Sequence, residues 1–509
     1  MKKHTRMTAL GASLLAAALA LTGCAFGGDD GGTGGDAGAD DAILRVANPT
    51  PIASLDPLGA NSADLPTLAV TQMVFETLVA RVDGEFEPRL ATSWENPDPL
   101  TWEFTIADDV EFADGTPVTS ADAKASLDQL IANEGPLVST WAAVETVEAP
   151  DDTTLRITTS DPLGTVLSNL ALLPVVPADK VADADFFAAP YGSGPFVVTS
   201  FTPSQQVELE RNDNYHGATP DLAGLRYEYI PEVSGRITAL QNDEIDATWG
   251  LPADQLASVE GNADLTVESY PTYGNYYIWF NSSREPFTDV RVRQALWHAI
   301  DLEAIAPALF EGVGEVAEGP IPEAVFGSAA QSPYDYDPEK AKALLAEAGY
   351  PDGISTTMMW SAGCCAAGDQ FAEAMISDWA KVGITVEPQR LERAVWLDRL
   401  LALDWDSTMS TGSTITGDAD FTLARLYLST ANRMGYANPE LDELLLAARA
   451  ELDQERRAEL YADAGEIIWN DAVGIFPLDL TSNVVLRSDV SGFVPTPNDL
   501  PNFAGVTID

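Results

Sequence analysis

Cysteine and histidine are the side chains whose chemistry depends most on their spacing, and the chain has three of each. Cys364 and Cys365 are adjacent, so they are either two buried thiols or the two halves of a vicinal disulfide. No Cys-x-x-Cys pair is present, and His216 and His298 stand far apart. Structural zinc sites and thioredoxin-like redox sites need ligand pairs at short spacing. We therefore expect no metal site and no cofactor.

The sequence motifs of several hydrolase and nucleotide-binding classes are missing. No Gly-x-Ser-x-Gly, His-Glu-x-x-His or Walker A run occurs. Acid pairs such as Asp418 and Asp420 arise by composition alone in so acidic a chain, and the carboxylates of a glycosidase have no fixed sequence pattern. We therefore predict that the protein is not an enzyme, and keep an exported hydrolase as an alternative.

The N-terminus has the parts of a secretory signal peptide. Three of the first six residues are basic, and residues 10–21 form an apolar stretch. That stretch is too short to span a bilayer, which takes about 20 residues. It ends in Leu-Thr-Gly followed by Cys24, which resembles the bacterial lipobox. We predict that residues 1–23 are a signal peptide and that Cys24 carries a diacylglyceryl group.

Residues 24–41 are rich in Gly and Asp and almost free of apolar side chains. Such a segment cannot bury a core, so we predict a disordered tether between the lipid and a folded body. The lipid alone then holds the protein on the outer face of the cell membrane, outside the cytoplasm.

Acidic residues outnumber basic ones by 79 to 27, which gives a formal net charge of −52. Loss of residues 1–23 removes three basic and no acidic residues, so the mature charge becomes −55. Such a charge opposes binding to nucleic acid and to anionic membrane surfaces. We interpret it as a solvated acidic surface; attraction of a cationic ligand is the other interpretation.

Residues 42–509 exceed what one hydrophobic core normally supports, so two or more lobes are expected. Capping residues predict helices that begin after Thr119, Asp289 and Asp337. Stretches of alternating apolar and polar residues predict strands, and a mixture of strands and helices predicts α/β lobes. These strands lie at 43–46, 102–106, 155–158, 196–198, 207–209, 227–230, 354–359, 384–386 and 407–410.

Four groups of motifs, in order along the chain, resemble one known family. They are Leu-Asp-Pro at 55–57; Phe-Glu-Pro-Arg-Leu-Ala-Thr-Ser-Trp at 86–94 with Trp-Glu-Phe at 102–104 and Val-Glu-Phe-Ala-Asp-Gly-Thr-Pro at 110–117; Gly-Ser-Gly-Pro-Phe at 192–196 with Leu-Glu-Arg-Asn at 209–212; and Phe-Asn at 280–281 with Pro-Phe at 286–287 and Val-Arg-Val-Arg-Gln-Ala-Leu at 290–296. Together they resemble the dipeptide/oligopeptide/nickel class (family 5) of bacterial extracellular solute-binding proteins. The resemblance covers about residues 42–509.

The resemblance implies an α/β fold, a two-lobed periplasmic-binding-protein-like clamshell of type II. Lobe I would take residues 42–272 and 482–509, with an extra subdomain at about 78–185. Lobe II would take residues 273–481. Arg291 and Arg293 would be structural salt-bridge partners rather than ligand contacts.

The function implied is that of an extracytoplasmic substrate-binding lipoprotein of an ABC importer. Such a protein captures a small solute between its lobes as a monomer and delivers it to permease subunits. A sensor or adhesin that binds the same ligand without transport fits the sequence equally well.

The ligand contacts implied by the resemblance lie near the expected hinge and at strand ends. They are Ser193 in the Gly-Ser-Gly-Pro loop, Trp249, Tyr273, Asn275 and Trp360. Pockets for small molecules combine aromatic walls with a few polar groups, which these residues supply. We expect loss of the Trp249 or Trp360 ring to weaken solute binding more than tenfold, about 1.4 kcal/mol.

A hydroxyl-rich loop adds five more candidates: Gly412, Ser413, Thr414, Thr416 and Asp418. In peptide-binding relatives this loop carries a carboxylate for the peptide amino terminus, but here that position falls near Thr416. Those relatives also hold the ligand carboxylate with an Arg in the segment that here is 361–370, which has none. Both departures weaken a dipeptide assignment. The hydroxyls suit an oligosaccharide or a longer peptide held through its backbone.

Overall fold

The computed structural model describes residues 42–509 except 83 and 366. The predicted signal peptide, the tether and Cys24 lie outside these residues. Within the described part, none of the helices combines the length and the apolar character needed to span a bilayer.

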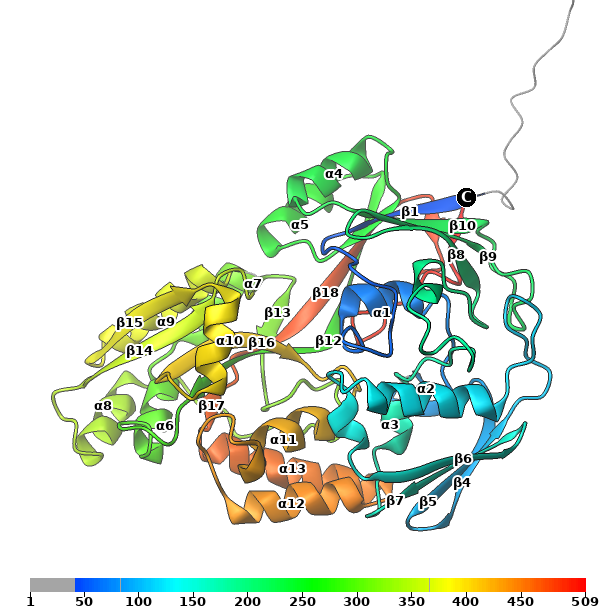
Figure 1. The fold of residues 1–509 in the computed structure, drawn as a ribbon. Coiled ribbons are helices and arrows are strands. Elements are labelled where there is room, and N and C mark those ends of the chain that lie inside the picture. Colours follow the sequence, from blue (N-terminus) through cyan, green and yellow to red (C-terminus); the bar gives the residue numbers. More distant parts are fainter. Residues whose placement is uncertain (1–41, 83, 366) are drawn as a thin grey trace, which may run out of the picture. The chain divides into compact units, whose positions relative to one another are not determined.

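The largest sheet has twelve strands: β1 (Ile43–Asn48), β8 (Phe196–Thr202), β9 (Gln206–Arg211), β10 (Gly224–Tyr229), β11 (Ala247–Trp249), β12 (Leu265–Phe280), β13 (Gly314–Val316), β14 (Ile354–Ser361), β15 (Ile384–Leu391), β16 (Ser407–Ser413), β17 (Gly474–Ile475) and β18 (Leu478–Arg487). Their order is β15-β14-β16-β12-β18-β11-β1-β10-β9-β8, with β13 beside β18 and β17 beside β12 (Figure 1). The sheet is mixed: β1 pairs in parallel with β10, and β14 with β15.

Smaller sheets complete the strands. A four-stranded antiparallel sheet has the order β4-β5-β7-β6. The strands β2 and β3 form one further antiparallel pair, and β19 and β20 form another. Their bounds are β2 (Val79–Val82), β3 (Glu85–Pro88), β4 (Ala91–Asp98), β5 (Thr101–Ile106), β6 (Val144–Asp151), β7 (Thr154–Thr159), β19 (Val490–Ser491) and β20 (Thr507–Ile508). All nine predicted strands are confirmed, except that Ile230 follows the last residue of β10.

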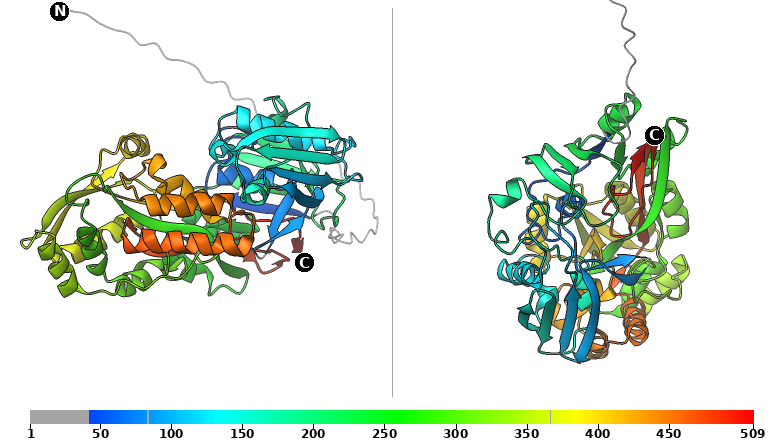
Figure 2. Two further views of the ribbon diagram at one scale, coloured as in Figure 1. Left: turned by 90° about the horizontal axis from the view of Figure 1, so that it is seen from below. Right: turned by 90° about the vertical axis from the view of Figure 1, so that its right-hand side faces the viewer.

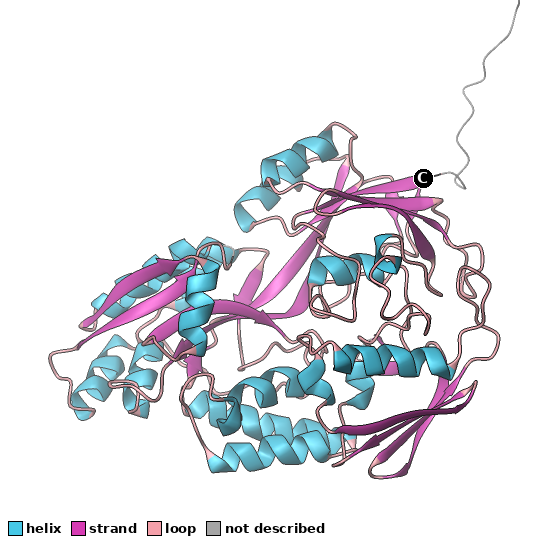
Figure 3. Ribbon diagram, viewed as in Figure 1, coloured by secondary structure: helices cyan, strands magenta, loops and turns pink. Residues whose placement is uncertain are grey.

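Helices lie beside strands throughout the described chain, as an α/β fold requires (Figure 3). The α-helices are α1 (Leu65–Thr71), α2 (Ser120–Ala132), α3 (Val166–Leu170), α4 (Val233–Gln241), α5 (Ala253–Val259), α6 (Val290–His298), α7 (Leu302–Phe310), α8 (Pro338–Glu347), α9 (Gly368–Ala380), α10 (Arg393–Leu401), α11 (Ala419–Tyr427), α12 (Pro439–Ala450) and α13 (Gln454–Asn470). Single 3-10 turns lie at Val138–Trp141, Phe186–Ala188 and Ser429–Ala431. Figure 2 shows α12 and α13 side by side.

Local capping chemistry explains why three of these helices begin where they do. Thr119 and Asp122 form the predicted capping box of α2. The Asp289 carboxylate accepts a hydrogen bond from the Arg291 amide at the start of α6, and Asp337 caps α8 in the same way. Each cap satisfies amides that have no partner inside the helix.

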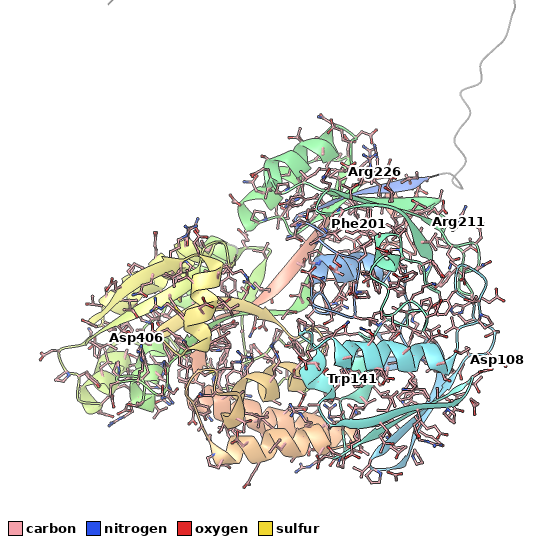
Figure 4. The ribbon with its side chains drawn as sticks, viewed as in Figure 1. Asp108, Trp141, Phe201, Arg211, Arg226 and Asp406 are labelled. Carbon is pink, nitrogen blue, oxygen red and sulfur yellow. A yellow bond between two sulfur atoms is a disulfide. The ribbon has the colours of Figure 1, made fainter. Side chains whose placement is uncertain are left out.

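Two hydrophobic cores lie along the large sheet. The N-terminal core gathers mainly residues 44–227 and 484–506, and the C-terminal core mainly residues 237–478. Trp141, labelled in Figure 4 beside α2, is buried in the N-terminal core. Two separate cores agree with a two-lobed architecture.

Strand β12 passes from one core to the other beside β18. Tyr270 packs in the N-terminal core and Tyr276 in the C-terminal core. The register with β18 is regular through Pro271 and shifts before Asn275, which lies opposite Asp479. The backbone within this irregularity is held by other partners, since the Tyr273 amide donates to the Pro497 carbonyl and the Thr272 hydroxyl to the Leu480 carbonyl.

The two arginines after Asp289 serve the fold in different ways. Arg291 forms the predicted ion pair, its Nη2 meeting the Asp289 carboxylate over 2.5 Å. For Arg293 the salt-bridge prediction is wrong, because its buried guanidinium donates to the backbone carbonyls of Phe287, Asp471 and Ala472. Carbonyl oxygens at a chain turn supply the partners that a buried guanidinium needs.

Candidate functional site

A cavity of about 240 Å³ lies beside β12 and β16. Three of the predicted ligand contacts line it: Asn275, Gly412 and Ser413. They meet there because the two strands are antiparallel neighbours, with Asn275 directly opposite Gly412 and Ser413 opposite Gly274. Strand pairing therefore gathers residues that are more than 130 positions apart in the chain.

Aromatic rings form much of the wall of this cavity. Tyr277 and Trp279 alternate along β12 on the face that carries Asn275, and their rings stack with centroids 4.1 Å apart. Tyr427 accepts a hydrogen bond from the Trp279 indole over 3.1 Å, which satisfies that buried donor. Phe476 completes the apolar part of the wall.

A glycine sets the distance between β16 and the Tyr277 ring. A Cβ built at Gly412 would stand 3.2 Å from Tyr277 Cε1, tighter than ordinary van der Waals contact. The Asn275 amide donates to the Pro320 carbonyl over 3.1 Å, which fixes its orientation in the cavity wall. The site is thus preformed, with a rigid apolar side and a small number of polar groups.

Of the four remaining candidates of this region, Tyr273 lies on β12, and Thr414, Thr416 and Asp418 follow β16. The Tyr273 ring lies against Gly417, where an added Cβ would stand 2.8 Å from the ring. The Tyr273 carbonyl accepts from the Thr414 amide over 2.9 Å, and Thr414 shares a hydroxyl hydrogen bond with Thr422. The Arg81 guanidinium on β2 donates to the carbonyls of Thr416 and Gly417.

Asp418 is engaged within the protein. It caps α11, and both of its carboxylate oxygens accept hydrogen bonds from the guanidinium of Arg457 on α13. The Ser168 hydroxyl on α3 donates to the same carboxylate over 2.8 Å. Although burial by itself raises its pKa, the Arg457 charge holds the pKa of Asp418 below its usual range.

Two candidates lie on the side of the N-terminal core. Trp249 is buried at the end of β11, opposite Val484. Ser193 is fully buried, and its hydroxyl has no partner among the described residues. Its flanking glycines are needed for close packing, because a Cβ at Gly192 would stand 2.3 Å from the Val74 carbonyl oxygen.

Trp360 lies apart from the β12–β16 cavity. It lines a second cavity of about 550 Å³ together with residues of α9 and β15, and its indole donates to Asp369 over 2.7 Å. The adjoining Cys364 and Cys365 are joined in a vicinal disulfide. The Cys364 carbonyl accepts from the hydroxyl of Thr411, which lines the first cavity.

Sequence reasoning missed several side chains of the first cavity, namely Tyr277, Trp279, Tyr427, Arg425 and Arg433. The alternation of β12 placed Tyr277 and Trp279 on the same face as Asn275, which was a usable signal. Among the described residues, no group of three or more His, Cys, Asp or Glu side chains is arranged to hold a metal ion.

The chain is similar to proteins of one family over most of its length. The family model of bacterial extracellular solute-binding proteins, family 5 Middle, matches residues 85–434. The probable D,D-dipeptide-binding periplasmic protein DdpA of Escherichia coli is 30% identical, with 89% of this chain and 91% of that protein covered. The glutathione-binding protein GsiB of Pectobacterium atrosepticum is 28% identical, with 91% and 93% covered.

A solved structure gives the same result for the fold. The periplasmic binding protein DppA of Helicobacter pylori, in complex with the peptide STSA, superimposes with a TM-score of 0.78 at 25% identity. The match covers 92% of this chain and 98% of that one. The predicted two-lobed α/β fold is therefore confirmed, and this chain belongs to the bacterial extracellular solute-binding proteins of family 5.

Proposed function

We propose that the protein captures a small peptide-like or oligosaccharide-like solute outside the cytoplasmic membrane and delivers it to the permease subunits of an ABC importer. The observation that carries this proposal is the preformed cavity beside β12 and β16, where Asn275, Gly412 and Ser413 meet an aromatic wall. Such a cavity buries a small solute and fixes its orientation through a few polar contacts.

The residues that line the cavity all fall within 273–481, the range that we propose for lobe II, so a solute bound there moves the lobes only if it also reaches lobe I. Asn275 follows the register shift at Pro271, where we place the boundary between lobe I (42–272 and 482–509) and lobe II (273–481). A solute that contacts both lobes binds the closed arrangement more tightly and so shifts the population toward it. The permease then distinguishes loaded from empty protein by that arrangement.

A peptide-like solute has more support than an oligosaccharide. Two relatives are named for D,D-dipeptides and for glutathione, and the solved relative holds a peptide. The stacked Tyr277 and Trp279 rings suit either an apolar side chain or the face of a sugar. The hydroxyls of Thr411 and Ser413 beside them suit backbone amides and sugar hydroxyls alike.

A thermal-shift screen of the mature protein against peptides and neutral and acidic oligosaccharides tests the function. A solute present at 100 times its dissociation constant adds about 2.7 kcal/mol to the free energy of unfolding, which raises the melting temperature. We expect members of one class to produce such a rise. Absence of any rise across both classes would contradict solute capture.

We also propose that a lipid on Cys24 holds the protein on the outer face of the cell membrane. The support is the sequence alone: a basic start, a short apolar stretch and a Cys after Leu-Thr-Gly. Cys24→Ser should move the protein from the membrane to the soluble fraction, whereas the matched control Cys364→Ser should stay on the membrane. An unchanged membrane fraction for Cys24→Ser rules out the anchor.

A further inference from the structure

Two arginines line the cavity beside β12 and β16. Arg425 lies in the last turn of α11, and Arg433 lies in the segment that joins α11 to α12. Both side chains are partly buried. They place positive charge inside a chain whose formal net charge is −52.

Arginines on the neighbouring helices α12 and α13 are paired with carboxylates, and these two are not. Arg449 meets Asp420 over 2.9 Å, and Arg457 meets Asp418 over 2.9 Å. In the described residues no salt bridge joins Arg425 or Arg433 to a carboxylate. In a chain with 79 acidic residues, an arginine that lines a cavity without an acidic partner is unexpected.

The contacts of Arg425 leave much of its guanidinium available to the cavity. Its Nε donates to the Phe421 carbonyl one turn earlier, over 2.8 Å. Its Cζ lies 4.3 Å from the centre of the Phe421 ring, which holds the guanidinium plane in place. Within the described residues, no hydrogen bond or ion pair uses its two terminal nitrogens. A guanidinium held in one orientation presents these nitrogens as a fork that fits a carboxylate.

Arg425 and Arg433 line the same cavity, and their charges influence each other there. Burial lowers the pKa of Arg425, and the charge of Arg433 lowers it further. Burial raises the pKa of the Tyr277 hydroxyl, while the charges of Arg425, Arg393 and Arg433 oppose that rise. Like charges repel each other more strongly in a partly desolvated space than in water, and a bound anion offsets this repulsion.

We propose that Arg425 and Arg433 form an anion subsite of this cavity, and that the transported solute carries a carboxylate held there. The inference rests on the proposed function and adds a substrate class to it. A guanidinium binds a carboxylate through two parallel hydrogen bonds, which supply both strength and orientation. With the carboxylate at Arg425 and Arg433, the rest of the solute lies along Tyr277 toward Asn275 and Ser413.

Two sources supply such a carboxylate: the C-terminus of a peptide and the uronate of an acidic sugar. Titration calorimetry of the mature protein with matched pairs distinguishes them. One pair is trialanine and its C-terminal amide, and the other is digalacturonate and its methyl ester. We expect the charged member of one pair to bind at least tenfold more tightly than its neutral partner.

Variants locate the subsite. Arg425→Gln/Arg433→Gln should weaken the charged probe at least tenfold and remove the difference within the pair. The control Arg456→Gln, which removes an exposed guanidinium paired with Glu459, should change neither affinity. Arg433→Gln alone should leave the melting temperature of the unliganded protein unchanged or higher, because it relieves repulsion; a clear drop overturns the subsite even if no probe binds.

The outcomes separate this inference from the proposed function. Equal binding of charged and neutral probes, or a charge preference that survives in the double variant, overturns the subsite. A charged solute that binds with the same affinity to wild type and double variant overturns the subsite and leaves solute capture standing. Failure of every charged and neutral solute to bind overturns both.

Discussion

Asp418 and Arg457 form a two-fold hydrogen-bonded ion pair, with Oδ1 to Nη2 at 2.9 Å and Oδ2 to Nη1 at 3.0 Å. The side chains are 2% and 0% exposed. The Asp418 carboxylate also accepts a hydrogen bond from the Ser168 hydroxyl on α3. This bond connects a residue of the N-terminal part of the chain to the ion pair in the C-terminal part. The carboxylate expected to face the ligand instead stabilises the packing around the cavity.

Asp418→Asn should therefore reduce stability strongly. Removal of one partner leaves the Arg457 charge buried and uncompensated, which costs about 3–5 kcal/mol. Denaturant unfolding of the unliganded protein measures this change. The exposed Asp398→Asn serves as the control and should stay within about 0.5 kcal/mol of wild type. Equal stability of the two variants would contradict the structural role of Asp418.

Stability should fall with rising pH because of Asp479 on β18. Burial, together with the charges of Glu323, Glu315 and Glu318, raises the pKa of Asp479 from 3.8 to about 7. Its Oδ1 is buried and has no partner among the described residues. The folded protein thus keeps a proton that the unfolded chain releases, so this contribution to stability is complete below about pH 4 and lost as pH rises through about 7.

Asp479→Asn removes that ionisation. Its free energy of unfolding should exceed that of wild type by on the order of 4 kcal/mol at pH 8 and match it near pH 4, since the pKa is raised by about three units and one unit corresponds to about 1.4 kcal/mol. Denaturant titrations across this range provide the curve. The exposed Asp352→Asn should keep the wild-type slope. Parallel curves for wild type and Asp479→Asn would show that Asp479 ionises as an ordinary carboxylate.

Gly412→Val should weaken solute binding at least tenfold. The added Cβ alone stands 3.2 Å from Tyr277 Cε1, and the two further carbons enter the cavity. Calorimetry with a solute identified by the thermal-shift screen measures the loss. Gly261→Ala is the control, because nothing lies within 4 Å of a Cβ at that position.

Trp360→Ala distinguishes the two cavities. The expected tenfold loss on removal of this ring places part of the solute in the cavity between α9 and β15. If Trp360→Ala reduces affinity and Gly412→Val does not, the solute occupies that second cavity and the β12–β16 cavity is excluded as the main site. The buried Trp249 is tested by the same titration of Trp249→Ala.

The vicinal disulfide should affect the β12–β16 cavity through Thr411. The Cys364 carbonyl accepts from the Thr411 hydroxyl over 3.4 Å, and Thr411 lines the cavity. Reduction with dithiothreitol frees this loop and should lower solute affinity at least threefold, about 0.6 kcal/mol. The double variant Cys364→Ser/Cys365→Ser should not respond to the reductant. An unchanged wild-type affinity would mean that the loop and the cavity are independent.

Local patterns predicted what depends on neighbours in the sequence. Alternation predicted β5, β7 and β14, and the caps Asp289 and Asp337 predicted α6 and α8, because strand faces and helix starts are decided within a few residues. Strand pairing explains why Asn275 lies beside Gly412 and Ser413, which the family resemblance had implied in two separate groups.

Contacts between distant segments were beyond local patterns. The partner of Asp418 lies 39 residues away on another helix, so no spacing rule could show that the carboxylate is paired. Arg293 is held by carbonyls of a turn almost 180 residues later, which made an ordinary salt bridge the wrong prediction. Arg425 and Arg433 became visible as candidates only when the structure showed that they line the same cavity as residues of β12 and β16.

A crystal structure of the mature protein with a solute found by the screen tests the central claim most directly. We predict solute density in the cavity beside β12 and β16, in contact with Asn275 and Ser413. The carboxylate of the solute should lie at Arg425 and Arg433. Density confined to the cavity beside Trp360, or outside both cavities, would contradict this account.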